Sequence, residues 1–195
     1  MNFIQKDRKI VLASASPRRQ QLLKQISLDF IVKASSFDEE SIYNEIPEQY
    51  VMQLASCKAQ EVAKLPEFND YLIIGADTTV YFNNSYLNKP NDEREAKLML
   101  QQLSNNWHQV YSGICLIDNK MQQIETNYSV TQVKFRELNE QEVDYYISTG
   151  SPMDKAGSYG IQDDFGALFV EEIKGDYYNV VGLPLVKLYL MLISI

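Results

Sequence analysis

Residues 71–82 read YLIIGADTTVYF, a run of apolar and β-branched side chains that predicts a buried strand. The run passes into the turn dipeptide Asn83-Asn84, so we expect a hairpin whose second strand continues through residue 88. Before this run, residues 47–65 carry apolar side chains at helical spacing, which predicts an amphipathic helix. The centre of the expected fold is therefore a strand with a helix before it and a hairpin after it.

Outside this centre, expected strands alternate with expected helices. Helices should start at Pro17, after an N-cap at Ser16, at residue 92, at Asn139 and at Pro184. Strands are expected at residues 9–13, 28–34, 108–117, 121–136, 168–173 and 177–182, and the glycines of residues 155–167 predict a shaped loop. Because this order mixes crossovers with hairpins, we predict an α/β fold with a mixed sheet flanked by helices.

The composition is that of a globular protein without a general affinity for nucleic acid. Its 195 residues are 45% apolar and 23% charged, and no boundary is visible, so we expect a single domain over residues 1–195. The net charge of −8, from 18 basic and 26 acidic side chains, opposes binding to DNA or RNA. The first residues do not read as a signal peptide and residues 183–195 are too short to span a bilayer, so we predict a cytoplasmic protein with no membrane segment.

Any metal ion in this protein should be held by oxygen ligands. Cys57 and Cys115 match no metal or redox spacing and are expected to be buried free thiols. His108 is the only histidine, which excludes a histidine-built metal site, and its place at the start of a strand is typical of a packing residue. Oxygen ligands favour Mg²⁺ or Mn²⁺ as a cofactor.

The stretch Ser14-Ala15-Ser16-Pro17-Arg18-Arg19 gathers hydroxyls, backbone N–H groups and two guanidinium groups at one helix N-terminus. The helix dipole and these donors favour an anion, and arginine binds oxyanions through two hydrogen bonds. Two arginines at this end also oppose the dipole unless an anion offsets them. The pattern indicates a phosphate site, and the alternative is an ordinary Ser-Pro cap followed by two solvated arginines.

Two charged residues stand where apolar residues are expected. Asp77 follows the apolar residues 72–76, so it should have a partner or a task, such as holding a metal ion or orienting water, unless it only closes a turn. Lys58 falls on the apolar stripe of the helix over residues 47–65. It would complete a cationic wall around a triphosphate, or it would simply extend its ammonium group from the edge of the core into water. Because methionine suits the apolar stripe, we expect Lys58→Met to weaken nucleotide handling without loss of stability, and in the second case to cost little in either property.

Three further polar residues are candidates on weaker signals. Glu39, in the acidic loop SSFDEE, would bind a cation or a base edge unless it is simply solvated. Lys89 stands before Pro90, between the hairpin and the next helix, and alone indicates little. Gln162 lies in the glycine-rich loop, and its amide both donates and accepts hydrogen bonds, which suits the edge of a nucleobase.

Five stretches together resemble the Maf family of nucleotide pyrophosphatases. They are LASASPRRQQLL, IGADTTV, KPNDEREAKLMLQQLS, PMDKAGSYGIQ and GDYYNVVGLPL, and they cover nearly the whole chain in order. The resemblance implies a Maf/ITPase-like fold with a nucleotide-binding cleft and a homodimer. It also implies that the substrate is a nucleoside triphosphate, which is cut to the monophosphate and pyrophosphate.

The resemblance assigns roles to the candidate residues. Asp77 corresponds to the family's catalytic proton acceptor. Arg18, Thr78 and Gln162 stand where the family's specificity classes differ, and they are similar to the dTTP/UTP class and unlike the 7-methyl-GTP class. The substrate-binding residues that the resemblance implies are Ser16, Arg18, Arg19, Glu39, Lys58, Thr78, Lys89 and Gln162. The pair Asp163-Asp164, where glycine is usual, departs from the family pattern beside the residue expected to contact the base.

Two other functions stay open from the sequence. Family members are associated with septum formation and division arrest, so one alternative is a non-catalytic regulator that binds a nucleotide or a protein. The other is an enzyme of relaxed preference that removes modified nucleotides such as 5-methyl-UTP or pseudo-UTP. A pyrophosphate-release assay over canonical and modified nucleotides separates the three functions.

Overall fold

The computed structural model describes residues 8–162 and 165–195, and over these residues the fold is mixed α/β, as the sequence predicts. Seven strands in these ranges form one sheet in the order β2-β1-β3-β5-β6-β7, and β4 pairs with β3. The strand β1 pairs in parallel with β2 and β3, whereas β4 on β3 and β7 on β6 are antiparallel. The strands are β1 (Lys9–Leu12), β2 (Phe30–Val32), β3 (Tyr71–Phe82), β4 (Ser85–Leu87), β5 (Trp107–Asp118), β6 (Gln123–Phe135) and β7 (Val170–Lys174).

Most helices begin where their caps predict. The Ser16 hydroxyl accepts the backbone N–H of Arg19, and Asn139 and Glu142 form a capping box. The α-helices are α2 (Pro17–Gln25), α3 (Pro47–Ala63), α4 (Glu93–Leu103), α5 (Glu140–Ser148), α6 (Tyr177–Val181) and α7 (Leu185–Ser194). Short 3₁₀ helices are η1 (Glu39–Ser41), η2 (Pro66–Phe68), η3 (Ser151–Asp154), η4 (Ala156–Ser158) and η5 (Phe165–Phe169). Within the described ranges, no helix has the length and apolar character needed to cross a membrane.

The strand expected at residues 177–182 is wrong, because residues 177–181 form the helix α6. The Asp176 carboxylate accepts the backbone N–H of Tyr178 at 2.8 Å, a local bond that starts a helical turn. The buried Asn179 amide then donates to the Val110 carbonyl and the Thr131 hydroxyl, both at 2.9 Å. These tertiary bonds override the β preference of the aromatic and valine residues in this segment.

The described chain separates into two compact units, each assembled from segments that are distant in sequence. Unit 1 contains residues up to Asp77 together with 112–129 and 182–195, and unit 2 contains residues 78–111 and 130–181. The expectation of a single domain stays a prediction. Each unit has its own apolar core.

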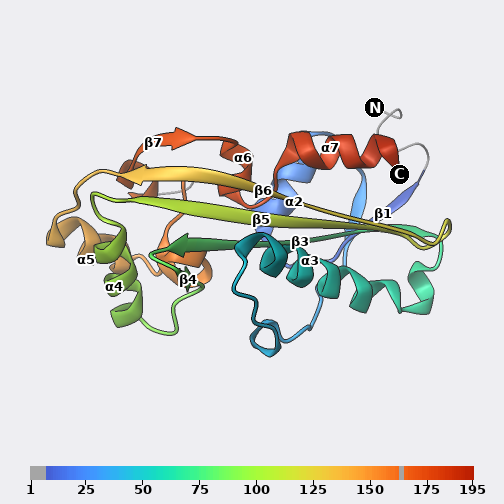
Figure 1. Cartoon of the computed structure of the whole chain (residues 1–195), viewed down its shortest axis with the longest axis horizontal. Coiled ribbons are helices and arrows are strands. Elements are labelled where there is room, and N and C mark those ends of the chain that lie inside the picture. The colour runs from blue at the N-terminus through green and yellow to red at the C-terminus, as the bar shows by residue number, and fades with distance from the viewer. Residues whose placement is uncertain (1–7, 163–164) are drawn as a thin grey trace. The chain divides into compact units, whose positions relative to one another are not determined.

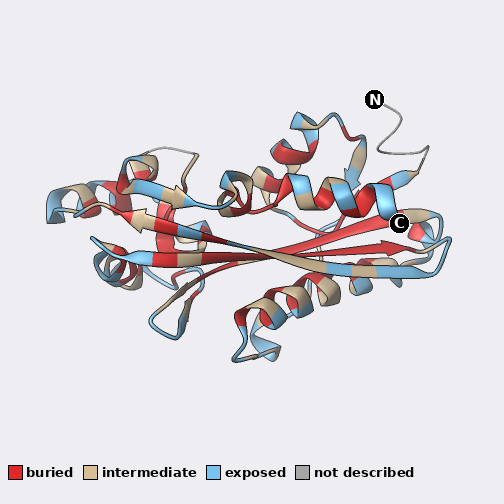
Figure 2. Cartoon of the chain, turned by 45° about the horizontal axis from the view of Figure 1, so that its top comes forward, coloured by how far each residue is buried: buried red, intermediate tan, exposed pale blue. Residues whose placement is uncertain are grey.

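In unit 1, helices cover both faces of the strands. The helix α3 lies on one side of β1 and β3, and α2 and α7 lie on the other (Figure 1). Figure 2 shows buried residues along β1, β3 and β5 and a mixture of buried and exposed residues along the helices, as expected for a helix with one face on a sheet. The core between α3 and the strands contains Val11, Ala13, Ala55, Ala59, Val62, Phe68, Ile73, Cys115 and Ile117.

The backbone of α3 approaches the strands closely at two glycines. A Cβ added at Gly75 in β3 would overlap the Ala55 carbonyl oxygen and lie 2.7 Å from the Ala59 Cβ. A Cβ added at Gly113 in β5 would overlap the Val51 carbonyl group. Since real Cβ atoms do not tolerate such contacts, these two glycines are what allow α3 to lie directly on the sheet.

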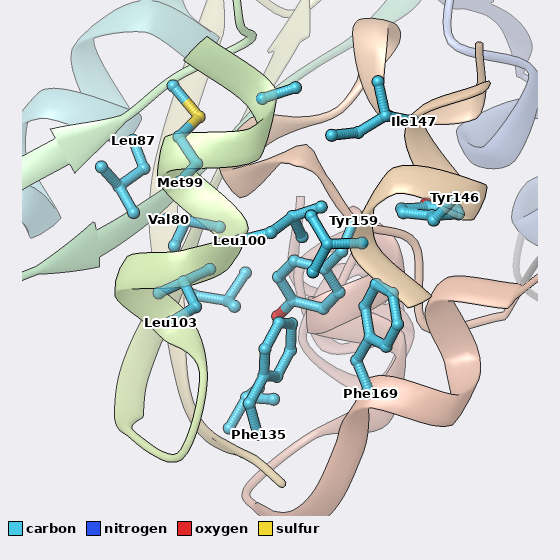
Figure 3. Close-up of a cluster of buried hydrophobic side chains, with 14 residues drawn as sticks. Val80, Leu87, Met99, Leu100, Leu103, Phe135, Tyr146, Ile147, Tyr159 and Phe169 are labelled. Atoms are coloured by element: carbon cyan, nitrogen blue, oxygen red, sulfur yellow. The ribbon is translucent and has the colours of Figure 1, made fainter. Parts of the chain in front are cut away.

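The core of unit 2 is rich in aromatic rings. The rings of Phe135 and Tyr159 meet edge to face with centroids 4.7 Å apart, and Tyr146 meets Phe169 in the same way at 5.2 Å. Figure 3 shows these rings beside leucine and methionine side chains from α4. The buried members of this core are Val80, Leu87, Ala96, Met99, Leu100, Leu103, Val110, Val133, Phe135, Val143, Tyr146, Ile147, Tyr159 and Phe169.

His108 is enclosed by this aromatic core, which confirms it as a packing residue. Its side chain is 2% exposed, its Nε2 lies 2.8 Å from the Tyr159 hydroxyl, and its ring stands edge-on to Phe135. The buried Nδ1 has no hydrogen-bond partner among the described residues. Burial lowers the pKa of His108 to about 3, so the imidazole is neutral at physiological pH.

Acidification should therefore destabilise the protein through His108. Its pKa is about 3 in the folded protein, but about 6.5 in an unfolded chain. The unfolded state thus binds a proton that the folded state rejects, and the free energy of unfolding falls as the pH drops from about 6.5 towards 3. Between pH 7 and pH 5 the loss should be about 2 kcal/mol, measured by urea unfolding.

The matched control for this pH effect is His108→Gln. Glutamine still offers a polar atom to Tyr159 but does not titrate, so the stability of the variant should change little between pH 7 and pH 5. Subtracting its profile from that of the wild type isolates the histidine, since the chain has no other. Parallel profiles for the two proteins would contradict the assignment.

Candidate functional site

Three charged side chains of unit 1 meet at a buried ion-pair cluster. Lys58 on α3 places its Nζ 2.5 Å from Oδ1 of Asp77 on β3 and 2.7 Å from Oε1 of Glu39 in η1. The side chains of Lys58 and Asp77 are 10% and 8% exposed, whereas that of Glu39 is 44% exposed. One ammonium group thus holds two carboxylates together, and the cluster opens to solvent on the Glu39 side.

The close contact between α3 and β3 explains why Lys58 reaches Asp77. Ala59, the residue after Lys58, packs against Gly75. Alternate residues of a strand point to the same face, so Asp77 follows Gly75 on the face that α3 covers. Lys58 itself is buried, so the alternative of a lysine at the core edge with its ammonium group in water is wrong.

The helix N-terminus after β1 forms a second part of the site. Ser16 caps α2, and the buried Arg19 donates from Nε to the Gly182 carbonyl at 2.9 Å and from Nη1 to the Ser14 hydroxyl at 3.0 Å. Arg18 is only partly buried. The alternative of two solvated arginines is therefore wrong for Arg19, which is fixed in place by the protein.

The charges of these two parts act on each other. Burial lowers the pKa of the Arg19 guanidinium from its ordinary value, and the negative charges of Asp77 and Glu39 oppose this effect. Arg18 adds a further positive charge that lowers the pKa of Arg19. Arginine stays protonated in proteins, so the site carries three cationic and two anionic side chains on a chain whose net charge is −8. Among these five side chains the basic ones outnumber the acidic ones by one, so they could meet a polyanion.

The carboxylates of Asp77 and Glu39 are the oxygen donors at this site. Among the described residues, no group of three or more histidine, cysteine, aspartate or glutamate side chains forms a ready metal cage. Mg²⁺ is commonly held by one or two carboxylates together with water and substrate phosphates. The two carboxylates, beside three basic side chains, fit an ion of this kind.

The other expected site residues belong to unit 2. Thr78 follows Asp77 in β3 and is partly buried, Lys89 is exposed after β4, and Gln162 is partly buried in the loop after η4. These three residues stay predictions as substrate contacts. Asp163 and Asp164 lie outside the described residues.

Sequence reasoning missed two partners of Arg19. The first is the Ser14 hydroxyl, which lies in the Ser-Ala-Ser-Pro stretch where sequence reasoning assigned a role to Ser16 alone. This hydroxyl accepts hydrogen bonds from the Arg19 guanidinium and from the backbone N–H of Ser16, the latter at 3.3 Å. The spacing of Ser14 from a helix N-terminus is a usable signal. The Gly182 carbonyl has no comparable sequence signal, because it is a backbone group brought in from a distant segment.

Comparisons with known proteins cover nearly the whole chain. Residues 9–195 match the family model described as Maf-like protein. The chain is 51% identical over 187 residues to a dTTP/UTP pyrophosphatase of Clostridium botulinum (strain Kyoto / Type A2), covering 95% of this chain and 96% of the relative. A dTTP/UTP pyrophosphatase of Clostridium novyi (strain NT) is 52% identical over 182 residues, 93% of this chain and 94% of the relative. One of Clostridium tetani is 47% identical over 193 residues, 98% of this chain and 96% of the relative.

Replacing Lys58 by methionine should destabilise the protein, contrary to the expectation from the apolar stripe, because Lys58 is paired with two carboxylates. The change leaves the Asp77 carboxylate buried beside Glu39 without the cation between them, and breaking a buried pair in this way costs about 3–5 kcal/mol. Urea unfolding of Lys58→Met at neutral pH measures the loss. A further change of Asp77→Asn in the same protein removes the stranded charge and should recover most of it.

The matched control for this loss is Lys24→Met, at an exposed position in the last turn of α2. It removes the same charge and should change the stability by no more than about 0.5 kcal/mol. A Lys58→Met protein as stable as the Lys24→Met control would mean that the ion-pair cluster contributes nothing to the fold.

Proposed function

This chain belongs to the Maf family, and we propose that it is a nucleoside triphosphate pyrophosphatase that cuts dTTP and UTP to the monophosphate and pyrophosphate. The observation that carries the proposal is the buried cluster of Asp77, Lys58 and Glu39 in the same unit as the arginines of the helix N-terminus. Relatives of about half identical sequence that are named for this activity support the substrate.

In the proposed reaction, water attacks the α-phosphorus of the nucleotide. The bond from that phosphorus to the oxygen bridging to the β-phosphorus breaks, and pyrophosphate leaves with the bonding electrons. Asp77 takes the proton from the attacking water as general base. Burial of this carboxylate keeps competing solvent away, and the hydrogen bond from Lys58 holds its orientation.

Cationic side chains bind the phosphate groups in this proposal. Arg18 lies at the first turn of α2, where backbone N–H groups and the helix dipole also favour an anion. Arg19 is held in place by Ser14 and the Gly182 carbonyl, so less conformational entropy is lost when it meets a phosphate. Lys89 enters the proposal through the family resemblance alone.

A divalent cation, Mg²⁺ or Mn²⁺, is the proposed cofactor, since nucleotide pyrophosphatases of this family generally depend on a metal. Asp77 and Glu39 would hold it together with phosphate oxygens. When bound, it would neutralise charge on the triphosphate as bonding changes at the α-phosphorus. The role of Lys58 is then to keep the two carboxylates close to each other before the nucleotide arrives.

Selectivity for dTTP and UTP is proposed for Arg18, Thr78 and Gln162. The Gln162 amide would donate to a pyrimidine carbonyl while accepting from the N3–H group, a pattern that thymine and uracil share. Removal of modified pyrimidine nucleotides before their incorporation would follow from the same contacts. A cytoplasmic location, a homodimer and a part in division arrest complete the proposal as family expectations.

Asp77→Asn should nearly abolish pyrophosphate release from dTTP. The amide keeps the shape of the side chain and its bond from Lys58 but cannot accept a proton, so turnover should fall by about 10²–10⁴-fold. The matched control is Asp118→Asn, because Asp118 is also a buried aspartate on a strand of unit 1, with 7% of the whole residue exposed against 6% for the whole of Asp77. Wild-type turnover by folded Asp77→Asn protein would remove Asp77 from the reaction.

Gln162→Glu should change substrate preference more than stability. A carboxylate can only accept hydrogen bonds, so it would repel the pyrimidine carbonyl to which the amide donates. The kcat/KM values for dTTP and UTP should therefore fall by about tenfold or more relative to that for CTP. The control Gln123→Glu adds the same charge at an exposed position of β6. If dTTP, UTP, CTP and GTP all lose the same factor, Gln162 does not contact the base.

A further inference from the structure

The loop that carries Glu39 is attached to α3 at a second place. The hydroxyls of Ser35 and Ser36 donate to the two carboxylate oxygens of Glu61, Ser36 to Oε1 at 2.5 Å and Ser35 to Oε2. Glu61 stands three residues after Lys58 on α3, so the two side chains leave neighbouring turns of one helix face. The loop is thus fixed to the same helix by Glu61 at its start and by Lys58 at Glu39.

Residues 35–41, which contain both attachments, also form local hydrogen bonds. The backbone N–H of Phe37 donates to the Ser35 hydroxyl at 3.1 Å, and the N–H of Glu40 donates to the Asp38 carboxylate at 3.1 Å. The N–H of Ser41 closes the turn of η1 on the Asp38 carbonyl at 3.2 Å. One of these bonds orders the start of the segment and the other two order the turn that carries Glu39, so a shift of Ser35 and Ser36 would be passed on to Glu39 over a short length of chain.

Glu61 is suited to this attachment by its charge. The hydrogen bond from Ser35, followed by that from Ser36, lowers the pKa of the Glu61 carboxyl, and backbone N–H groups of the loop add to this effect. The group is therefore ionised at neutral pH, and hydrogen bonds to an ionised acceptor are about twice as strong as neutral ones. Without Glu61, Ser35 and Ser36 would lose their hydrogen bonds to α3, and the loop would be held to that helix through Glu39.

We propose that Glu61 is a positioning residue of the candidate site, which holds residues 35–41 so that the Glu39 carboxylate meets Lys58 beside Asp77. Glu61 itself touches none of the groups that would react. Its effect on turnover passes through Glu39 and rests on the proposed function. Its effect on the loop does not depend on the proposed function, so the effect on the loop and the effect on turnover are tested separately.

The first test measures amide hydrogen exchange in residues 36–41 without nucleotide. Glu61→Ala removes both hydroxyl partners, and exchange in this segment should accelerate about tenfold or more. The control Gln60→Ala changes the adjacent α3 side chain, whose hydrogen bond runs within the helix to Ser56, and should leave the segment unchanged. Equal exchange in wild type and Glu61→Ala would overturn the proposal, whatever the protein catalyses.

The second test is a double-mutant cycle on kcat/KM for dTTP with Mg²⁺. Glu61→Ala should lower kcat/KM about threefold to tenfold in the wild-type background, but less than about twofold when Glu39→Gln is already present. A loss of equal size in both backgrounds, or none in either, would overturn the positioning role. A wild-type protein that hydrolyses neither dTTP nor UTP would refute the proposed function instead, and the exchange test would then decide on Glu61.

Discussion

The contact between the α3 backbone and Gly75 of β3 is the constraint on which the candidate site depends. The small side chains of Ala55 and Ala59 let the helix lie directly on the strand, and any Cβ at Gly75 would hold it away. At this separation a lysine side chain from α3 spans to the next residue on the same face, Asp77. The chemistry of the site therefore follows from a packing distance that glycine and alanine set between them.

A buried carboxylate next to another carboxylate is unfavourable unless a cation lies between them. In this protein the ammonium group of Lys58 lies between the carboxylates of Asp77 and Glu39. Lys58 thereby also preserves the spacing of two oxygen donors that a divalent ion bound to a triphosphate would use. The same arrangement serves the stability of unit 1 and its proposed reaction, so changes to it should affect both.

Much of the fold could be predicted from the sequence, because its signals are local. The cap at Ser16, the capping box at Asn139 and the turn at Asn83-Asn84 are each complete within a few residues, and the structure confirms the elements that they start. The strand predicted at residues 177–182 was wrong because the hydrogen bonds that hold α6 in place run to Val110 and Thr131, and no local sequence pattern reveals them.

The site could be predicted only in part, for the same reason. Helical spacing showed that Lys58 lies on the buried face of α3, but it could not show which carboxylates the lysine meets. The family resemblance supplied the residue set without its geometry. The attachment of Ser35 and Ser36 to Glu61 joins residues that are 25 and 26 positions apart, and neither source indicated it.

The way the chain is divided between the two units bears on how the protein folds as it is made. The chain passes from one unit to the other after Asp77, Tyr111, Ser129 and Val181, so neither unit is a continuous stretch. The guanidinium of Arg8 donates to the carbonyl of Leu192 in α7, a contact across 184 positions. Contacts of such long sequence separation slow folding because a large loop must close first. The unit that holds Asp77 and Lys58 therefore completes its structure only after α7 has left the ribosome. Truncation before α7 should damage the site, although α7 is far from Asp77 and Lys58 in the sequence.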